Sequence, residues 1–188
     1  MFLKDKVDDF EQYSGRNSIR INCVSDFQGE DTDDITESMA KAMDVELTDD
    51  MIDRSHRVGP KSTTDHRNRA VVVKFTSYRH KEKFMAVKKK LFRIDARKLF
   101  PEAKWPALPP PSCASSSSLS TLSSSSTSRI AVNDDLTKTR AQLAAMARDS
   151  KRRKNIDDTW VRSGVIVIKK NDSVYKVTTK REFDTLVA

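Results

Sequence analysis

Polar and cationic side chains at alternate positions of two predicted strands are the residues of this 188-residue chain best placed to do chemistry. Arg20 and Asn22 alternate with apolar residues in SIRINCV, and Lys74 alternates with them in AVVVKFT. A period of two places such residues on one strand face and the apolar residues on the other. We therefore expect an uncovered sheet face that can contact phosphates and polar base edges, with ordinary solvated strand residues as the alternative.

A charged residue on an apolar helix stripe is the second candidate. At about 100° per residue, Leu136, Leu143 and Ala147 share one helix face. Arg140 lies on that same face, so it is either paired with a carboxylate or points into a cleft where an anionic ligand is its partner. We favour the cleft, because the helix ends in the cationic run KRRK at 151–154. By itself, that run is also typical of a nuclear-import signal or a cationic helix end.

Net charge is distributed unevenly along the chain. The formal total is +8, although residues 1–50 hold five Lys and Arg against fourteen Asp and Glu. The remaining residues therefore carry the positive excess. An acidic element beside a basic surface is the pattern expected of a polyanion binder, and a merely soluble basic protein is the alternative.

Residue spacing does not favour catalysis or metal binding. Cys23 and Cys113 lie far apart, and neither CxxC nor Cys/His ligand spacing occurs. Asp53 and His56 are too generic a pair to indicate hydrolysis, which needs clustered carboxylates near a metal or an activated histidine. We therefore expect no enzyme activity and no cofactor. Since no stretch of about 18 apolar residues and no signal-peptide core is found, we expect a soluble, intracellular protein without a membrane partner.

The elements that must position these residues indicate an α+β fold. Residues 1–14 are a predicted coiled-coil remnant, with a frayed helical tail as the alternative, because Leu3, Val7 and Phe10 have heptad spacing. A domain with the order β-α-β-β-α-β is expected next, followed by a smaller one.

The first of these two domains is expected over residues 15–133 and should be RRM-like. It is interrupted at 93–128, where a Pro- and Ser-rich composition cannot bury enough apolar surface to become ordered, so we predict a disordered insertion. Residues 134–188 are expected to form a small domain of a helix, a β-hairpin and a helix.

Apolar periodicity locates the individual elements. Strands are predicted in SIRINCV, MIDRSHRVG, AVVVKFT and RIAVN, and a helix in YRHKEKFMAVKKKLF. Another helix begins near Asp31, where the carboxylates of DTDD suit a helix N-terminus, and its Ile35, Met39 and Met43 form a core-facing stripe.

Turn and cap residues bound the C-terminal elements. The helix from Leu136 is expected to be capped by Asn133, Asp134 or Asp135. GVIVIKK and SVYKVTT flank an Asn171-Asp172 turn, which predicts a hairpin, and KREFDTLV predicts a short final helix.

Several motifs in order resemble a known family. EQYSGRNSIRINCV, IDRSHRVG, AVVVKFTSYRHKEKF and VNDDLTKTRAQL are similar to segments of the RNA-binding protein encoded by the first open reading frame of LINE-type non-LTR retrotransposons. The resemblance implies a trimeric coiled-coil stalk, an RRM-like domain, and a C-terminal domain that completes a cleft for single-stranded RNA. It further implies a nucleic-acid chaperone that coats its own transcript, without enzymatic activity.

The resemblance also bears on single residues. Arg140 matches the arginine of the family's LTxxR segment, which is associated with RNA binding, and Arg16 and Arg20 match basic positions at the stalk junction. The strands lack the aromatic pair of an ordinary RRM, so we expect phosphate and sugar contacts to dominate, with weak sequence preference. Tyr78 and Trp160 are candidate stacking residues, although a tryptophan such as Trp160 is more often core.

We therefore predict a single-stranded RNA-binding protein, with single-stranded DNA as a second ligand, that forms a homotrimer where a full stalk exists. The expected location is a cytoplasmic ribonucleoprotein, with the nucleus as a second location. The alternatives are a protein-interaction module that does not bind nucleic acid, and a decayed, non-functional copy. The predicted nucleic-acid-binding residues are Arg16, Arg20, Asn22, Arg54, Arg57, Lys74, Arg79, Lys138, Arg140, Lys151, Arg152, Arg153 and Lys154.

Overall fold

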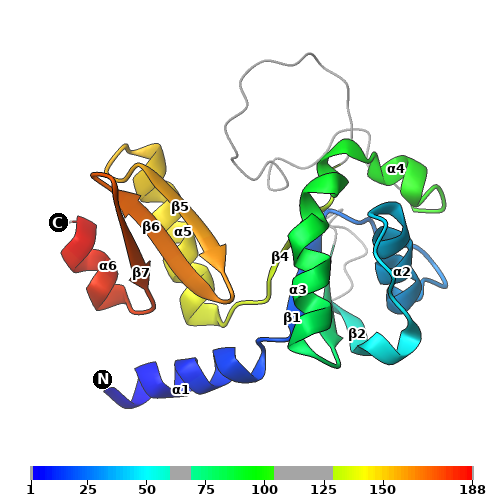
Figure 1. Cartoon of the computed structure of the whole chain (residues 1–188), viewed down its shortest axis with the longest axis horizontal. Coiled ribbons are helices and arrows are strands. Elements are labelled where there is room, and N and C mark those ends of the chain that lie inside the picture. Colours follow the sequence, from blue (N-terminus) through cyan, green and yellow to red (C-terminus); the bar gives the residue numbers. More distant parts are fainter. Residues whose placement is uncertain (1, 60–68, 104–128, 188) are drawn as a thin grey trace. The chain divides into compact units, whose positions relative to one another are not determined.

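The structure, a computed structural model, describes residues 2–59, 69–103 and 129–187 and has an α+β fold with two sheets (Figure 1). Its contacts divide the chain into two compact units. The central unit is Asn17–Asn133, and the terminal unit combines Met1–Arg16 with Asp134–Ala188. The helix expected as a stalk remnant therefore belongs to the same unit as the C-terminal residues.

The central unit is built on a four-stranded sheet with the order β2-β3-β1-β4. Its strands are β1 (Ser18–Asn22), β2 (Ile52–Val58), β3 (Ala70–Phe75) and β4 (Ala131–Asp134). Strand β3 pairs antiparallel with β1, placing Ile19 opposite Val73 and Ile21 opposite Val71, all fully buried. The alternation predicted for these two strands is therefore confirmed.

Helices cover one face of this sheet. They are α2 (Thr32–Ala42), α3 (Tyr78–Val87), η2 (Lys88–Arg93) and α4 (Ala96–Leu99), whereas the short 3-10 helix η1 (Asp49–Met51) before β2 buries no residue. Asp31 caps α2 by accepting a hydrogen bond from Asp33 N at 2.8 Å, and the stripe Ile35, Met39 and Met43 is buried as predicted. These side chains share one core with Phe84 of α3.

The predicted disordered insertion is wrong at its beginning. Ala96, Phe100 and Ala103 are buried in the central core, so the chain is folded up to residue 103. The reason is composition, because RIDARKLF contains enough apolar residues to bury one face. The low apolar content that predicted disorder belongs only to the Pro/Ser tract after it. The remainder of the predicted insertion, 104–128, lies outside the described residues, as do residues 60–68 of the polar connection before β3.

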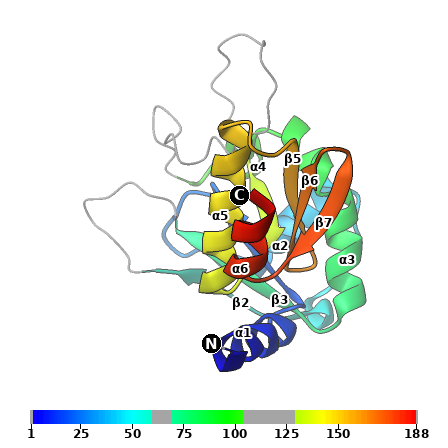
Figure 2. The ribbon, with the colours of Figure 1, turned by 90° about the vertical axis from the view of Figure 1, so that its left-hand side faces the viewer.

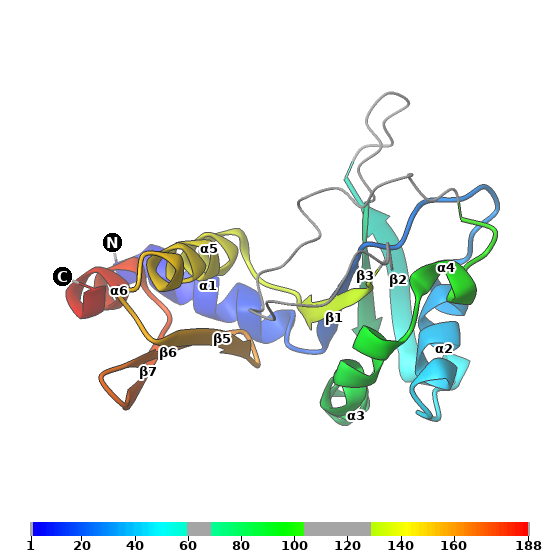
Figure 3. The same cartoon turned by 90° about the horizontal axis from the view of Figure 1, so that it is seen from above.

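The terminal unit contains a three-stranded antiparallel sheet with the order β5-β6-β7, with α5 and α6 on one face (Figure 2 and Figure 3). Its elements are α1 (Phe2–Ser14), α5 (Lys138–Arg152), β5 (Asp158–Arg162), β6 (Val165–Lys170), β7 (Ser173–Val177) and α6 (Lys180–Val187). Leu143 and Ala147 of α5, Ile166 and Ile168 of β6 and Phe183 of α6 form the core.

The hairpin at Asn171-Asp172 is confirmed, with φ of 50° and 58° at the two turn residues. The third strand, β5, was not expected. It is joined to β6 by Ser163 and Gly164, with φ of 51° and 77°, a second two-residue turn of the kind that suits hairpins. The prediction of a C-terminal domain with a helix, a hairpin and a helix is therefore wrong in its strand number, because the sheet has three strands.

The predicted cap of α5 is also wrong. The helix begins at Lys138, and Thr137 is the cap, its Oγ1 accepting from Arg140 N at 3.3 Å. Asn133 and Asp134 instead belong to β4. Helix α1 reinforces the cap, because Gln12 Oε1 accepts from Thr137 N at 3.1 Å. The sequence around the helix start could not reveal this partner 125 residues away.

Candidate nucleic-acid interface

The face of the central sheet that the helices leave uncovered carries four of the predicted residues. Strand registers place Arg54 opposite Lys74, and Arg20 opposite Val72, which in turn lies opposite His56. Cross-strand partners project from the same side of a sheet, and Asn22 shares the parity of Arg20. The expectation that Arg20, Asn22 and Lys74 share one face agrees with this register, and His56 is an addition.

Electrostatics on this face favours anions, with one local exception. Lys74 Nζ lies 3.0 Å from an Asp53 carboxylate oxygen, and the two side chains are 35% and 44% exposed. A pair this accessible is weak and screened by salt, so a phosphate can compete for the ammonium group. Arg54 is exposed next to it.

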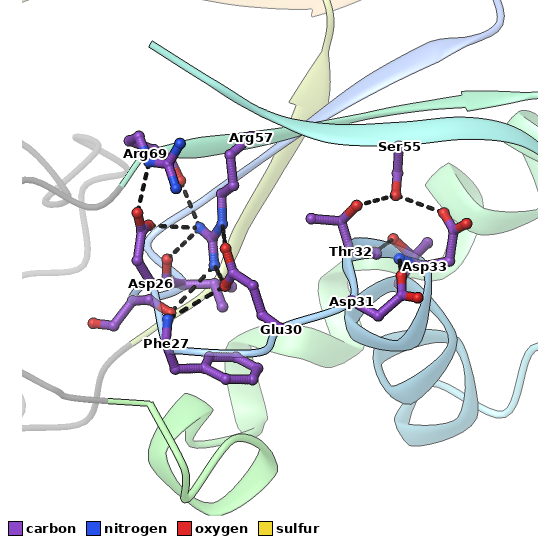
Figure 4. A network of polar contacts seen from close by, with 12 residues as sticks. Asp26, Phe27, Glu30, Asp31, Thr32, Asp33, Ser55, Arg57 and Arg69 are labelled. Carbon is purple, nitrogen blue, oxygen red and sulfur yellow. Dashed lines mark hydrogen bonds and ion pairs between the residues drawn. The ribbon is translucent and has the colours of Figure 1, made fainter. Parts of the chain in front are cut away.

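Arg57 lies on the opposite face of β2 and does not belong to this interface. Its side chain is only 4% exposed, and Figure 4 shows it surrounded by acceptors. All its guanidinium N–H groups donate: to both carboxylate oxygens of Glu30 (2.9 and 2.7 Å) and to the carbonyls of Val24, Ser25 and Arg69 (2.7, 3.2 and 2.6 Å). Since an arginine has no further donors, its predicted role in nucleic-acid binding is corrected to a structural one.

The network around Arg57 anchors the loop between β1 and α2. Asp26 lies 3.3 Å from Arg57 Nη1 and accepts from Arg69 Nε at 2.6 Å. Nearby, Ser55 of β2 donates to Asp33 at 2.5 Å and pairs with Thr32, which ties the first turn of α2 to the strand (Figure 4). Two carboxylates facing two guanidinium groups leave no excess positive charge there.

Arg140 is buried, and the cleft interpretation is wrong for it. Its side chain is 5% exposed, Nε donates to Asp8 at 2.9 Å, Nη2 to Asp9, and Nη1 to the Gly164 carbonyl at 2.9 Å. The alternative that the sequence left open, a carboxylate partner, is the one realised. Both carboxylate partners come from α1, more than 130 residues earlier in the chain.

The remaining predicted cations lie at the surface, several of them in ion pairs. Lys151 donates to Asp158 at 2.6 Å, a hydrogen bond that lowers the pKa of this carboxyl despite its partial burial. Arg153 pairs with Asp149 at 2.8 Å, and the Arg16 guanidinium lies 3.9 Å above the centre of the Tyr13 ring. Four more predicted cations are exposed: Arg79 on α3, Lys138 and Arg152 on α5, and Lys154 just after α5. Arg79 lies on a helix that covers the sheet, so it does not share the face of Arg20.

The uncovered face of the terminal sheet carries Trp160, a candidate stacking residue, together with two cations that are not among the predicted binding residues. Trp160 is 42% exposed on β5 and lies opposite Val167, which lies opposite Lys176. Arg162 shares the parity of Trp160, and both Arg162 and Lys176 are exposed. An indole flanked by cations can stack on a base while guanidinium and ammonium groups contact the phosphates. The Ser163-Gly164 turn is the sequence signal that would have placed these residues together.

No protein-family model matches the chain, and no curated protein shows significant sequence similarity to it. Within residues 2–59, 69–103 and 129–187, no group of three or more His, Cys, Asp or Glu side chains is arranged to hold a metal ion. In the same ranges, no helix is both long and apolar enough to cross a lipid bilayer.

Proposed function

We propose that the protein binds single-stranded RNA, with single-stranded DNA as a second ligand, through the uncovered faces of its two sheets. The proposal is supported by the strand order β2-β3-β1-β4 with helices on one face, which is the arrangement expected of an RRM-like domain. It is further supported by the resemblance of the ordered motifs to the retrotransposon RNA-binding family. The chain would then act as a nucleic-acid chaperone in a ribonucleoprotein, without catalysing a reaction.

One observation carries the proposal: Trp160 is 42% exposed on a sheet face that also carries the exposed cations Arg162 and Lys176. An exposed indole offers a flat surface, and every nucleic-acid base has a flat face that can stack on it. Any base can stack on an aromatic ring, and phosphate contacts do not depend on the base sequence. We therefore expect weak sequence preference.

Phosphate contacts supply most of the affinity in this proposal. Arg20, Arg54 and Lys74 on the central sheet and Arg162 and Lys176 on the terminal sheet neutralise phosphates and release counterions. Contacts of this kind exchange rapidly, so mispaired strands can separate and better-matched ones anneal. This is the physical basis of chaperone behaviour.

The experiment compares two exposed aromatic residues on opposite faces of one sheet. Tyr175 is also 42% exposed, but it borders a groove of about 520 Å³ between β7 and α6. We expect Trp160→Ala to weaken binding of a labelled single-stranded RNA by about 1–3 kcal/mol, the usual contribution of stacking on one base, and Trp160→Phe to retain most of the affinity. Tyr175→Ala is the matched control and should bind normally. Equal binding by Trp160→Ala and the wild type would refute the proposal.

A further inference from the structure

Arg140 joins three elements of the terminal unit at one buried point. It belongs to the first turn of α5, its Nε and Nη2 atoms donate to Asp8 and Asp9 of α1, and Nη1 donates to the Gly164 carbonyl between β5 and β6. Asp8 is 9% exposed, and its other carboxylate oxygen accepts from the Thr137 hydroxyl at the α5 cap. The carboxylate of Asp8 thus holds both the arginine and the start of its helix.

Gln12 completes this junction. Its Nε2 donates to the Asp135 carbonyl at 2.9 Å, and its side chain lies against Gly164. A Cβ atom at Gly164 would come within 2.7 Å of Gln12 Nε2, and Gly164 has φ of +77°, a conformation that glycine adopts most readily, so both features favour a glycine there. The β5–β6 turn is therefore held between α1 and α5.

The held turn adjoins the strand that carries Trp160. Arg162 is the last residue of β5, two positions before Gly164, and Trp160 lies two residues earlier on the same side. The junction itself is unsuited to bind an anion. Two aspartates surround a single guanidinium group, and Asp9 is 63% exposed, so the local charge that a phosphate would meet is negative.

We propose that Arg140 is a positioning residue that supports nucleic-acid binding without touching the nucleic acid. Asp8 and Asp9 of α1 hold the Arg140 guanidinium, and Arg140 Nη1 in turn holds the β5–β6 turn at the Gly164 carbonyl, which makes α1 a required part of the terminal binding unit. This inference rests on the proposed function of the Trp160 face.

The test uses a variant whose RNA affinity should fall if Arg140 positions the hairpin and should rise if Arg140 contacts the RNA directly. Asp8→Asn removes a negative charge, which by electrostatics alone would strengthen binding to a polyanion. If Arg140 positions the hairpin, Asp8→Asn weakens binding of a single-stranded RNA by about fivefold or more, as is usual for coupled sites. Asp5→Asn removes the same charge from an exposed position of the same helix and should not weaken binding.

Arg140→Gln tests the same inference through the salt dependence of RNA binding. A phosphate-contacting arginine contributes about 0.7 to the slope of log affinity against log salt for a single strand, so a positioning residue should leave that slope unchanged. Asp8→Asn binding as tightly as the wild type, or a slope reduced by about 0.7 in Arg140→Gln, would overturn the inference.

A measurement without RNA separates this inference from the proposed function. In a Trp105→Phe background, Trp160 is the sole tryptophan, and its fluorescence quenching by iodide reports the hairpin alone. We expect Asp8→Asn to change the quenching of Trp160 and Asp5→Asn to leave it unchanged. Unchanged quenching in Asp8→Asn would contradict the positioning role even if the wild type bound no RNA.

Discussion

Burial separates the arginines of this chain into two chemical roles. Arg57 and Arg140 are 4% and 5% exposed, and their donors end on carboxylates and carbonyls. Arg54 and Arg162 are exposed on uncovered sheet faces. Only the second kind can exchange water for phosphate at low cost, because a buried guanidinium must first break charge-assisted hydrogen bonds.

Arg54 and Arg57 test this separation on a single strand. Arg57→Ala leaves Glu30 and Asp26 without their buried partner, so we expect a loss of about 3–5 kcal/mol in the free energy of unfolding. Arg54→Ala removes an exposed side chain and should change that free energy by no more than about 0.5 kcal/mol, while weakening RNA binding. Urea denaturation and an RNA titration of both variants provide the measurement. Arg57→Ala retaining wild-type stability would contradict the structural role.

Glu37 predicts a pH dependence of stability. A hydrogen bond with Asp49, followed by desolvation and nearby negative charge, raises the pKa of Glu37 from 4.5 to about 6. The folded state therefore holds this proton more tightly than the unfolded chain does. The resulting stabilisation is present below pH 4.5 and is lost as the pH rises through 6.

Glu37→Gln mimics the protonated carboxyl at every pH. We expect the variant and the wild type to have similar urea midpoints near pH 4 and the variant to become the more stable one as the pH rises through about 6. A constant difference between Glu37→Gln and the wild type over this range would contradict the assignment.

At the scale of elements, α1 is an amphipathic helix whose polar side is buried and whose apolar side is exposed. Its polar residues Asp8 and Gln12 are buried, whereas Leu3, Val7 and Phe10 are 77%, 49% and 73% exposed. At about 100° per residue, these two sets lie on opposite sides of the helix. The buried polar side is satisfied by α5, and the apolar side has no comparable partner among the described residues. We therefore propose that the apolar side mediates self-association, in line with the trimer that the family resemblance implies.

Charge on the apolar side of α1 should abolish self-association. We expect the mass measured by light scattering to rise above one chain with concentration in the wild type and to stay at one chain in Leu3→Asp/Phe10→Asp. Lys4→Asp, at an exposed position outside the stripe, is the control. A wild type that stays at one chain throughout the concentration series would contradict the proposal, whether RNA is present or not.

At the scale of the whole molecule, the acidic N-terminal residues act as internal partners. The first 50 residues carry fourteen Asp and Glu, and Asp8 and Asp9 bind Arg140, while Asp26 and Glu30 bind Arg57. Part of the negative charge that predicted a separate acidic element therefore pairs with two buried arginines. The positive excess in the formal net charge of +8 therefore lies on the exposed cations.

Local patterns predicted the elements better than the roles of single residues. Alternation located β1 and β3, and an apolar stripe located α2, because each pattern depends only on near neighbours in sequence. Arg57 and Arg140 could not be interpreted in this way, since the carboxylates that pair with them lie 27 to 132 residues away. The sequence leaves Trp160 open as a core or a stacking residue, and only the register of β5 shows which face of the sheet it occupies.

The most direct measurement is a titration of labelled single-stranded RNA at a series of salt concentrations. If exposed cations and Trp160 bind an unpaired strand, the dissociation constant at low salt should lie below about 1 μM, and log affinity should fall linearly with log salt by about 0.7 per neutralised phosphate. Affinity that does not change with salt, or binding of micromolar strength or weaker at low salt, would contradict the account.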